Sequence, residues 1–160
     1  PRGAEPGNAA SVALRVDPGA GCTGCLGALL LGDLGEEEQA RLLAEHPLGS
    51  TDVLKVAHHG SAGFAERLYA AAGASVGLIG VGVGNGYGHP TARALEVLAA
   101  AGTTVFRTDR DGLILVSPPD APGSPPRVWT SRQDASTRRK TPLRAPGRGR
   151  FSTGRRVPLA

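Results

Sequence analysis

The chain has 160 residues, of which 40% are hydrophobic, and its formal net charge is +4. This length and composition fit one globular domain, and without a run of 18 consecutive apolar residues or a signal-peptide pattern we expect a soluble chain. The charge is divided unevenly, because residues 1–116 carry eight basic and twelve acidic side chains, whereas residues 117–160 carry ten and two. The high isoelectric point therefore belongs to the C-terminal part.

The predicted elements begin after a loose lead-in at residues 1–10, which is rich in Pro, Gly and Ala. Alternating side chains predict a half-buried strand over 11–16, and an apolar run predicts a buried strand over 26–32. The Gly-rich segment between them predicts a hairpin loop. Its Cys22 and Cys25 could form a disulfide or half of a zinc site. We favour two small residues without a special role, because no βαβ redox context surrounds them.

Helices and strands then alternate along the chain. Three glutamates in the first turn of the first helix are favoured by the helix dipole, and Pro90 suits the first turn of the last helix. An Asp-Gly turn predicts a closing hairpin. These elements are a helix over 36–46, a strand over 51–56, a helix over 62–72, a strand over 75–81, a helix over 91–101, and paired strands over 103–108 and 113–117. The order ββαβαβαββ predicts an α/β fold.

Beyond residue 117 the composition changes, since Pro, Ser, Gly and Arg dominate and apolar residues are too few to build a core. We therefore predict that residues 118–160 form a disordered basic tail. Its arginines could bind phosphate backbones or anionic lipid. A solvated terminus without a dedicated partner is the simpler interpretation.

Side chains that can bind metals follow three of the predicted strands. Asp33 could bridge two divalent ions through its two oxygens, or cap the next helix. On an extended strand His58 and His59 would point to opposite faces, so that one faces a site and the other supports it or meets substrate. His89, in a Gly-rich loop with Tyr87, could be a ligand, a proton donor or a contact at a helix N-terminus. The glycine spacing matches no nucleotide-binding motif.

In this order the segments resemble the later part of the metallo-β-lactamase-like domain at the C-terminus of ComEC competence proteins. The resemblance rests on five matches: residues 7–15 with "NN-x-S-hydrophobic-VL", 29–33 with "LLTGD", 52–61 with "DVLKVPHHGS" except for Ala57 in place of proline, 81–90 with "VG-x-N-x-YGHP", and 107–112 with "RTD-x-x-G". Five matches in one order are far more specific than any one of them.

The resemblance implies the C-terminal half of an αββα sandwich that carries part of a two-metal site for zinc or manganese. Such a site makes a hydroxide at neutral pH and stabilises charge on the attacked group. Either histidine of the adjacent pair could be the ligand, and His59 is preferred. The implied roles are metal ligation by Asp33 and His59, catalysis by His58, His89 and Lys55, and binding of an anionic substrate by Ser61, Asn85 and Tyr87.

One departure from the family pattern is that His-x-His-x-Asp-His, the principal metal-binding signature, is absent from the 160 residues. In complete family members it lies upstream, as do several membrane spans. We therefore expect part of a bacterial membrane protein that takes up DNA, with DNA and the channel portion of the same protein as partners. The intact domain would be a metal-dependent phosphodiesterase or nuclease, and this chain alone would be inactive. The alternatives are a non-catalytic nucleic-acid-binding module and a hydrolase of another phosphoester or a small acyl compound.

Overall fold

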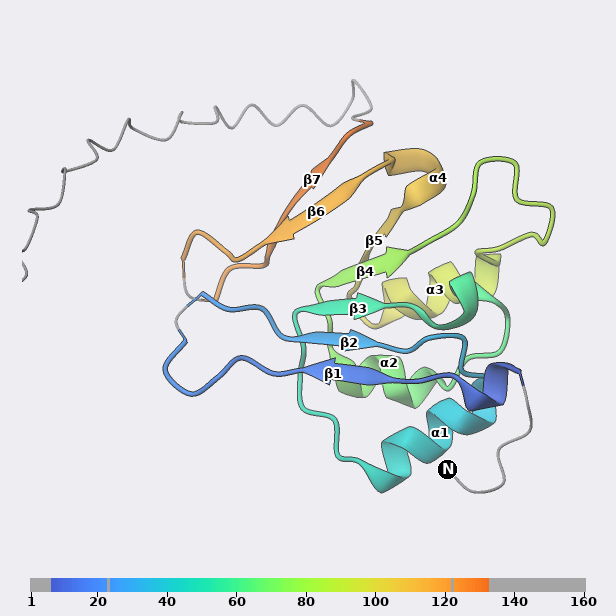
Figure 1. Ribbon diagram of the computed structural model, residues 1–160, viewed down its shortest axis with the longest axis horizontal. Coiled ribbons are helices and arrows are strands. Elements are labelled where there is room, and N and C mark those ends of the chain that lie inside the picture. Colours follow the sequence, from blue (N-terminus) through green and yellow to red (C-terminus); the bar gives the residue numbers. More distant parts are fainter. Residues whose placement is uncertain (1–6, 23, 122, 133–160) are drawn as a thin grey trace, which may run out of the picture.

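The computed structural model describes residues 7–22, 24–121 and 123–132, and its centre is a five-stranded sheet (Figure 1). The strands lie in sequence order: β1 (Leu14–Val16), β2 (Ala28–Leu30), β3 (Val53–Lys55), β4 (Val76–Ile79) and β5 (Thr104–Arg107). β1 is antiparallel to β2, and β2 to β5 are parallel. This mostly parallel sheet with connecting helices confirms the predicted α/β class.

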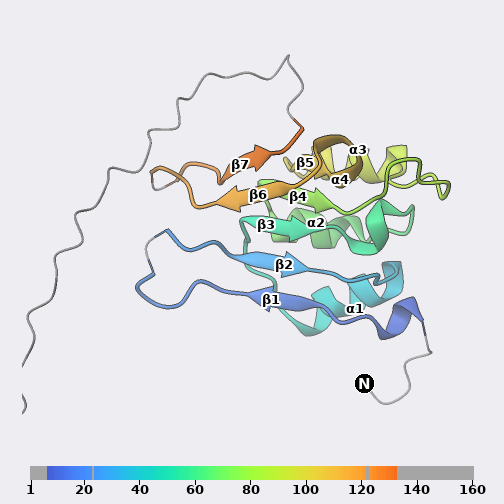
Figure 2. The same cartoon turned by 45° about the horizontal axis from the view of Figure 1, so that its top comes forward.

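Three helices cover one face of this sheet (Figures 1 and 2). They are α1 (Glu36–Glu45), α2 (Glu66–Ala72) and α3 (Ala92–Ala100), and each connects two neighbouring parallel strands. Two short 3-10 helices, η1 (Asn8–Ala10) and η2 (Ala57–Gly60), precede β1 and follow β3. α2 begins four residues later than predicted. Pro90 lies before α3 rather than in its first turn, because the hydroxyl of Thr91 caps that helix by accepting from the Ala94 N–H.

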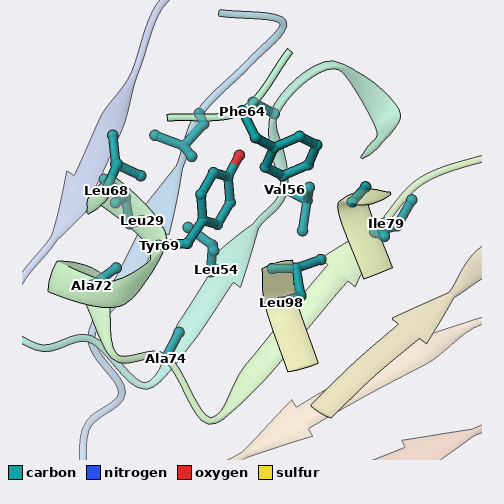
Figure 3. Close-up of a cluster of buried hydrophobic side chains, with 13 residues drawn as sticks. Leu29, Leu54, Val56, Phe64, Leu68, Tyr69, Ala72, Ala74, Ile79 and Leu98 are labelled. Atoms are coloured by element: carbon teal, nitrogen blue, oxygen red, sulfur yellow. The ribbon is translucent and has the colours of Figure 1, made fainter. Parts of the chain in front are cut away.

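The core lies between the sheet and the helices (Figure 3). Leu54 from β3 and Leu68 and Tyr69 from α2 are fully buried there. The ring of Tyr69 packs against that of Phe64, with the ring centroids 4.7 Å apart. Gln39 of α1 is also buried, and its amide nitrogen donates to the carbonyl oxygen of Leu34. Apolar packing on this face therefore holds the helices against the sheet.

The opposite face of the sheet carries apolar side chains that none of the described helices covers. The pairing of the strands places Leu14, Leu30, Lys55, Leu78 and Phe106 in one row across this face. Leu14 is 55% exposed and Leu30 is 38% exposed, and the exposed Val16 lies on the same side of β1 as Leu14. We call this the open face.

The chain after β5 differs from the prediction. A short helix, α4 (Thr108–Asp111), occupies the predicted hairpin turn, and β6 (Ile114–Ser117) pairs with β7 (Arg127–Thr130) instead of with β5. The predicted hairpin is wrong because the acidic side chains bind back onto the strand: the carboxylate of Asp111 accepts from the Arg107 N–H, and that of Asp109 binds the Arg107 guanidinium. These bonds hold the helical turn.

Two further predictions need correction. β7 lies inside the segment predicted to be disordered, so an ordered strand replaces part of that tail; residues 133–160 lie outside the described residues. Cys22 and Cys25 form a disulfide, with Cα atoms 5.7 Å apart, and so do not lack a role.

Of the predicted lead-in, residues 7–10 are described and include η1. Within the described ranges no helix is long and apolar enough to cross a membrane.

Candidate metal centre at the carboxyl ends of the strands

The predicted site residues gather where β2, β3 and β4 end. In a parallel sheet neighbouring strands end at the same edge, and the loops that follow them meet there. Asp33 lies just after β2, Lys55 is the last residue of β3, and His59 lies in η2 directly after it. The arrangement brings a carboxylate, an ammonium group and an imidazole together.

Asp33 does not cap α1, because the residue at the N-cap is Gly35. Its carboxylate is instead 40% exposed and faces Lys55, whose Nζ lies 3.8 Å from Oδ1. The same ammonium group donates to the carbonyl oxygen of Gly32 at 3.0 Å. Burial lowers the pKa of Lys55 below its usual value, and the nearby Asp33 carboxylate opposes that shift. A positive charge is thus held beside the Asp33 carboxylate.

His58 and His59 lie in a tight turn rather than on an extended strand, which corrects the geometry assumed for the pair. Both have positive φ angles, 43° and 52°, a conformation that is costly for residues with a Cβ. Hydrogen bonds hold the turn: the His58 N–H donates to the Gly32 oxygen at 3.0 Å, and the Ser61 N–H donates to the His58 oxygen at 2.9 Å. On this strained backbone the centroids of the two rings lie 6.4 Å apart and their planes are inclined at 66°.

The ring of His59 is oriented at both nitrogens. Nδ1 lies 2.6 Å from the carbonyl oxygen of Gly80, and because a carbonyl can only accept, Nδ1 carries the proton. When the ring is neutral, Nε2 therefore carries the lone pair, and this atom lies 3.6 Å from Asp33 Oδ1. A histidine that binds a metal almost always donates its other ring N–H in this way. Two donor atoms that bind the same ion, each with a bond of about 2.0–2.2 Å, lie at a separation similar to this distance between Nε2 and Oδ1. His59 and Asp33 therefore fit adjacent positions on one metal ion.

His58 belongs to a second group of rings. Its ring centroid lies 5.6 Å from that of His89, and the His89 ring lies 6.4 Å from that of Tyr87. The amide nitrogen of Asn8 lies 3.3 Å from His58 Nε2. Asn8 was not among the predicted site residues, although it lies in the first segment of the family resemblance. The resemblance of that segment is the feature of the sequence from which Asn8 could have been predicted as a site residue.

A pocket of about 350 Å³ opens beside these rings. Its lining includes His59, Asn85, Tyr87 and His89 together with glycines of the 80–86 loop. Asn85 shapes this loop, since its amide nitrogen donates to the His89 oxygen at 2.8 Å and its oxygen accepts from the Tyr87 N–H at 2.9 Å. Tyr87 is 88% exposed. The backbone of Ser61 contacts His58, but its side chain is not among the pocket residues.

The donors among the described residues fall short of a complete site. Among the described residues no group of three or more His, Cys, Asp or Glu side chains is close enough to hold a metal ion. A structural zinc site takes four ligands, and a catalytic one takes three and an open position. Asp33 and His59 would supply two ligands.

Comparison with known proteins finds similarity over part of the chain. No family model matches the chain, and no solved structure matches it. ComE operon protein 3 of Bacillus subtilis (strain 168) is 36% identical to the chain over 93 residues. The match covers 58% of this chain and 12% of that protein. The chain is therefore similar, over more than half of its length, to a short part of ComE operon protein 3.

Proposed function

We propose that this chain is the C-terminal half of a metallo-β-lactamase-like domain that hydrolyses phosphodiester bonds of DNA in a ComEC-like uptake protein. The observation that carries the proposal is the arrangement of Asp33 and His59: a carboxylate oxygen lies 3.6 Å from an imidazole nitrogen whose ring is fixed from behind by the Gly80 carbonyl. Such a backing bond is typical of metal-binding histidines.

The similarity to ComE operon protein 3 supports the same assignment of the parent protein. Because the chain matches 12% of that relative, the role in DNA uptake, the membrane location and a channel portion as partner all belong to the proposal. The open face supports the interpretation that this chain is half of a domain. Parallel sheets are almost always covered on both faces, and here Leu14 and Leu30 remain exposed. A second sheet packed there would complete a sandwich and bring the missing metal ligands.

Two divalent ions, zinc or manganese, bound at Asp33, His59 and the missing ligands would supply a nucleophile at neutral pH and stabilise charge on the attacked phosphate. The ammonium group of Lys55 faces the same carboxylate and would attract the phosphodiester. The ring of His89 lines the pocket, and the ring of His58 lies 5.6 Å from it. An imidazole in this position would transfer a proton to or from the leaving oxygen. The exposed ring of Tyr87 offers a surface on which a base can stack.

The test uses the complete gene product that contains this chain, purified in detergent and incubated with Mn²⁺ or Zn²⁺ and labelled single- and double-stranded DNA. We expect Asp33→Ala to lower cleavage roughly a hundredfold or more, because metals supply several kcal/mol of transition-state stabilisation. Asp17→Ala is the matched control, since Asp17 is an exposed carboxylate paired with Arg15.

Equal cleavage by the wild type and Asp33→Ala would contradict the proposal. If neither protein cuts DNA but both bind it with steep salt dependence, the non-catalytic binding module is favoured instead. Cleavage of a small phosphodiester but not of DNA would keep the metal chemistry and change the substrate.

A further inference from the structure

The residue that best explains how His59 is held lies outside the predicted site. The His59 ring depends on the direction of the Gly80 carbonyl, to which Nδ1 donates at 2.6 Å. Gly80 follows the last residue of β4, Ile79, which pairs with Arg107 as the final step of the β4–β5 ladder. Beyond that step β5 turns into α4, so the ladder cannot continue to position the chain after Gly80.

A side chain replaces the missing ladder step. The hydroxyl of Thr108 accepts from the Val81 N–H at 2.8 Å and donates to the Val81 carbonyl oxygen at 2.6 Å. One hydroxyl therefore satisfies both backbone groups of Val81, using its single proton and one lone pair. We call these two hydrogen bonds between Thr108 and Val81 the Thr108 clamp. Gly80 thus lies between two fixed residues: Ile79, held by the last ladder step, and Val81, held by the clamp. Because the Gly80 carbonyl and the Val81 N–H belong to the same planar peptide unit, the bond from Val81 to Thr108 also orients this carbonyl.

Thr108 is itself held in place. It is the first residue of α4, and the residue before it forms two bonds from its guanidinium to Asp109, at 3.0 and 2.6 Å. The Arg107 N–H donates to Asp111 at 2.6 Å, and Arg132, just after β7, donates to the Asp109 carbonyl at 3.0 Å. The segment that departs from the predicted hairpin thus forms a rigid support behind the candidate metal centre.

We infer that Thr108 is a positioning residue for His59: it fixes the Gly80 carbonyl, and so keeps the proton on Nδ1 and leaves Nε2 free to bind a metal beside Asp33. The part that concerns metal binding rests on the proposed function. The part that concerns the tautomer does not, because it follows from the bonds of this chain alone.

The test measures the tautomer directly on the 160-residue chain, labelled with ¹⁵N and without metal. Long-range ¹H–¹⁵N spectra distinguish protonated from unprotonated ring nitrogens. A pH series that is continued upward until the His59 signals no longer shift reports the neutral ring. His59→Gln identifies the His59 signals. In the wild type we expect protonated Nδ1 and unprotonated Nε2. In Thr108→Val, which removes the hydroxyl at nearly constant volume, the tautomer ratio should shift about fivefold toward protonated Nε2.

Two variants serve as controls. Thr108→Ser keeps the hydroxyl and should retain the wild-type ratio, and Thr104→Val makes the same substitution at an exposed position of β5. A folded Thr108→Val variant with unchanged His59 signals would overturn the inference. If that variant does not fold, Thr108→Cys, whose thiol is a weaker donor, takes its place with the same expected direction. Failure of the nuclease experiment leaves this result standing, and an unchanged tautomer leaves the nuclease proposal standing.

Discussion

The two faces of the five-stranded sheet differ in how far this chain completes them. On the covered face Leu54 is packed against α2 and is fully buried. On the open face Leu14 of β1 is also a leucine of the same sheet, yet it is 55% exposed. Mostly parallel sheets rarely leave a face uncovered. The difference indicates that the covered face stabilises this chain, whereas the open face is suited to a layer that the described residues do not supply.

The largest expected effect compares these two leucines. Leu54→Ala should lower the free energy of unfolding by about 2–5 kcal/mol, because it removes a fully buried side chain and leaves a cavity. Leu14→Ala should change it by less than about 0.5 kcal/mol, as is usual for exposed positions. Urea denaturation of the 160-residue chain measures both. Comparable losses in the two variants would show that the open face is already covered in solution.

A smaller effect tests whether the site loops are packed as firmly as the covered face. Gly60 ends the histidine turn with a φ of +81°, and a Cβ placed there would lie 2.6 Å from Cβ of Pro90. Gly60→Ala should therefore destabilise the chain by about 1–3 kcal/mol. Gly86→Ala is the matched control, since no atom lies within 4 Å of a Cβ at Gly86. Equal unfolding midpoints for the two variants would mean that the loop rearranges freely.

The smallest effect concerns the support behind the site. The Arg107 guanidinium, through its hydrogen bonds, holds the pKa of Asp109 below the usual value of 3.8, so the ion pair stabilises the fold above that pH. This contribution is lost as the pH falls through the lowered pKa. Asp109→Asn should cost about 0.5–1 kcal/mol at neutral pH. The difference from the wild type should shrink when unfolding is measured at progressively more acidic pH, and a difference independent of pH would contradict the ion pair.

Much of the covered face follows from the sequence alone, because its periodicity reports burial. Apolar runs and helical spacing predict β1 to β5 and α1 to α3 in the right order. The structure of the chain after β5 could not be predicted from the sequence in this way. Asp109 to Gly112 matches a hairpin turn by residue type, but side-chain bonds from Asp109 and Asp111 to Arg107 favour a helical turn, and β6 pairs with a strand inside a segment that looks disordered by composition.

The candidate site, too, could be predicted from the sequence only in part. Asp33, His58, His59 and His89 stand out by residue type and by their positions after apolar strands, and the structure brings them to one edge. Their residue types do not reveal the contacts that orient them. The left-handed turn at His58 and His59 and the bond to the Gly80 carbonyl depend on backbone geometry, and the Thr108 clamp joins residues 27 positions apart. No local pattern encodes such a bond.

The separation of Asp33 and His59 has a thermodynamic consequence. The two residues follow neighbouring parallel strands that are connected through a single helix, so folding of β2, α1 and β3 brings their backbones together. The Gly80 carbonyl after β4 then orients the His59 ring. The entropy of ordering these two donors is therefore lost when the chain folds, not when an ion arrives. In metal-dependent folds such as zinc fingers, by contrast, the ion organises its own ligands. An ion that binds here would add a concentration-dependent stabilisation to a fold that already exists.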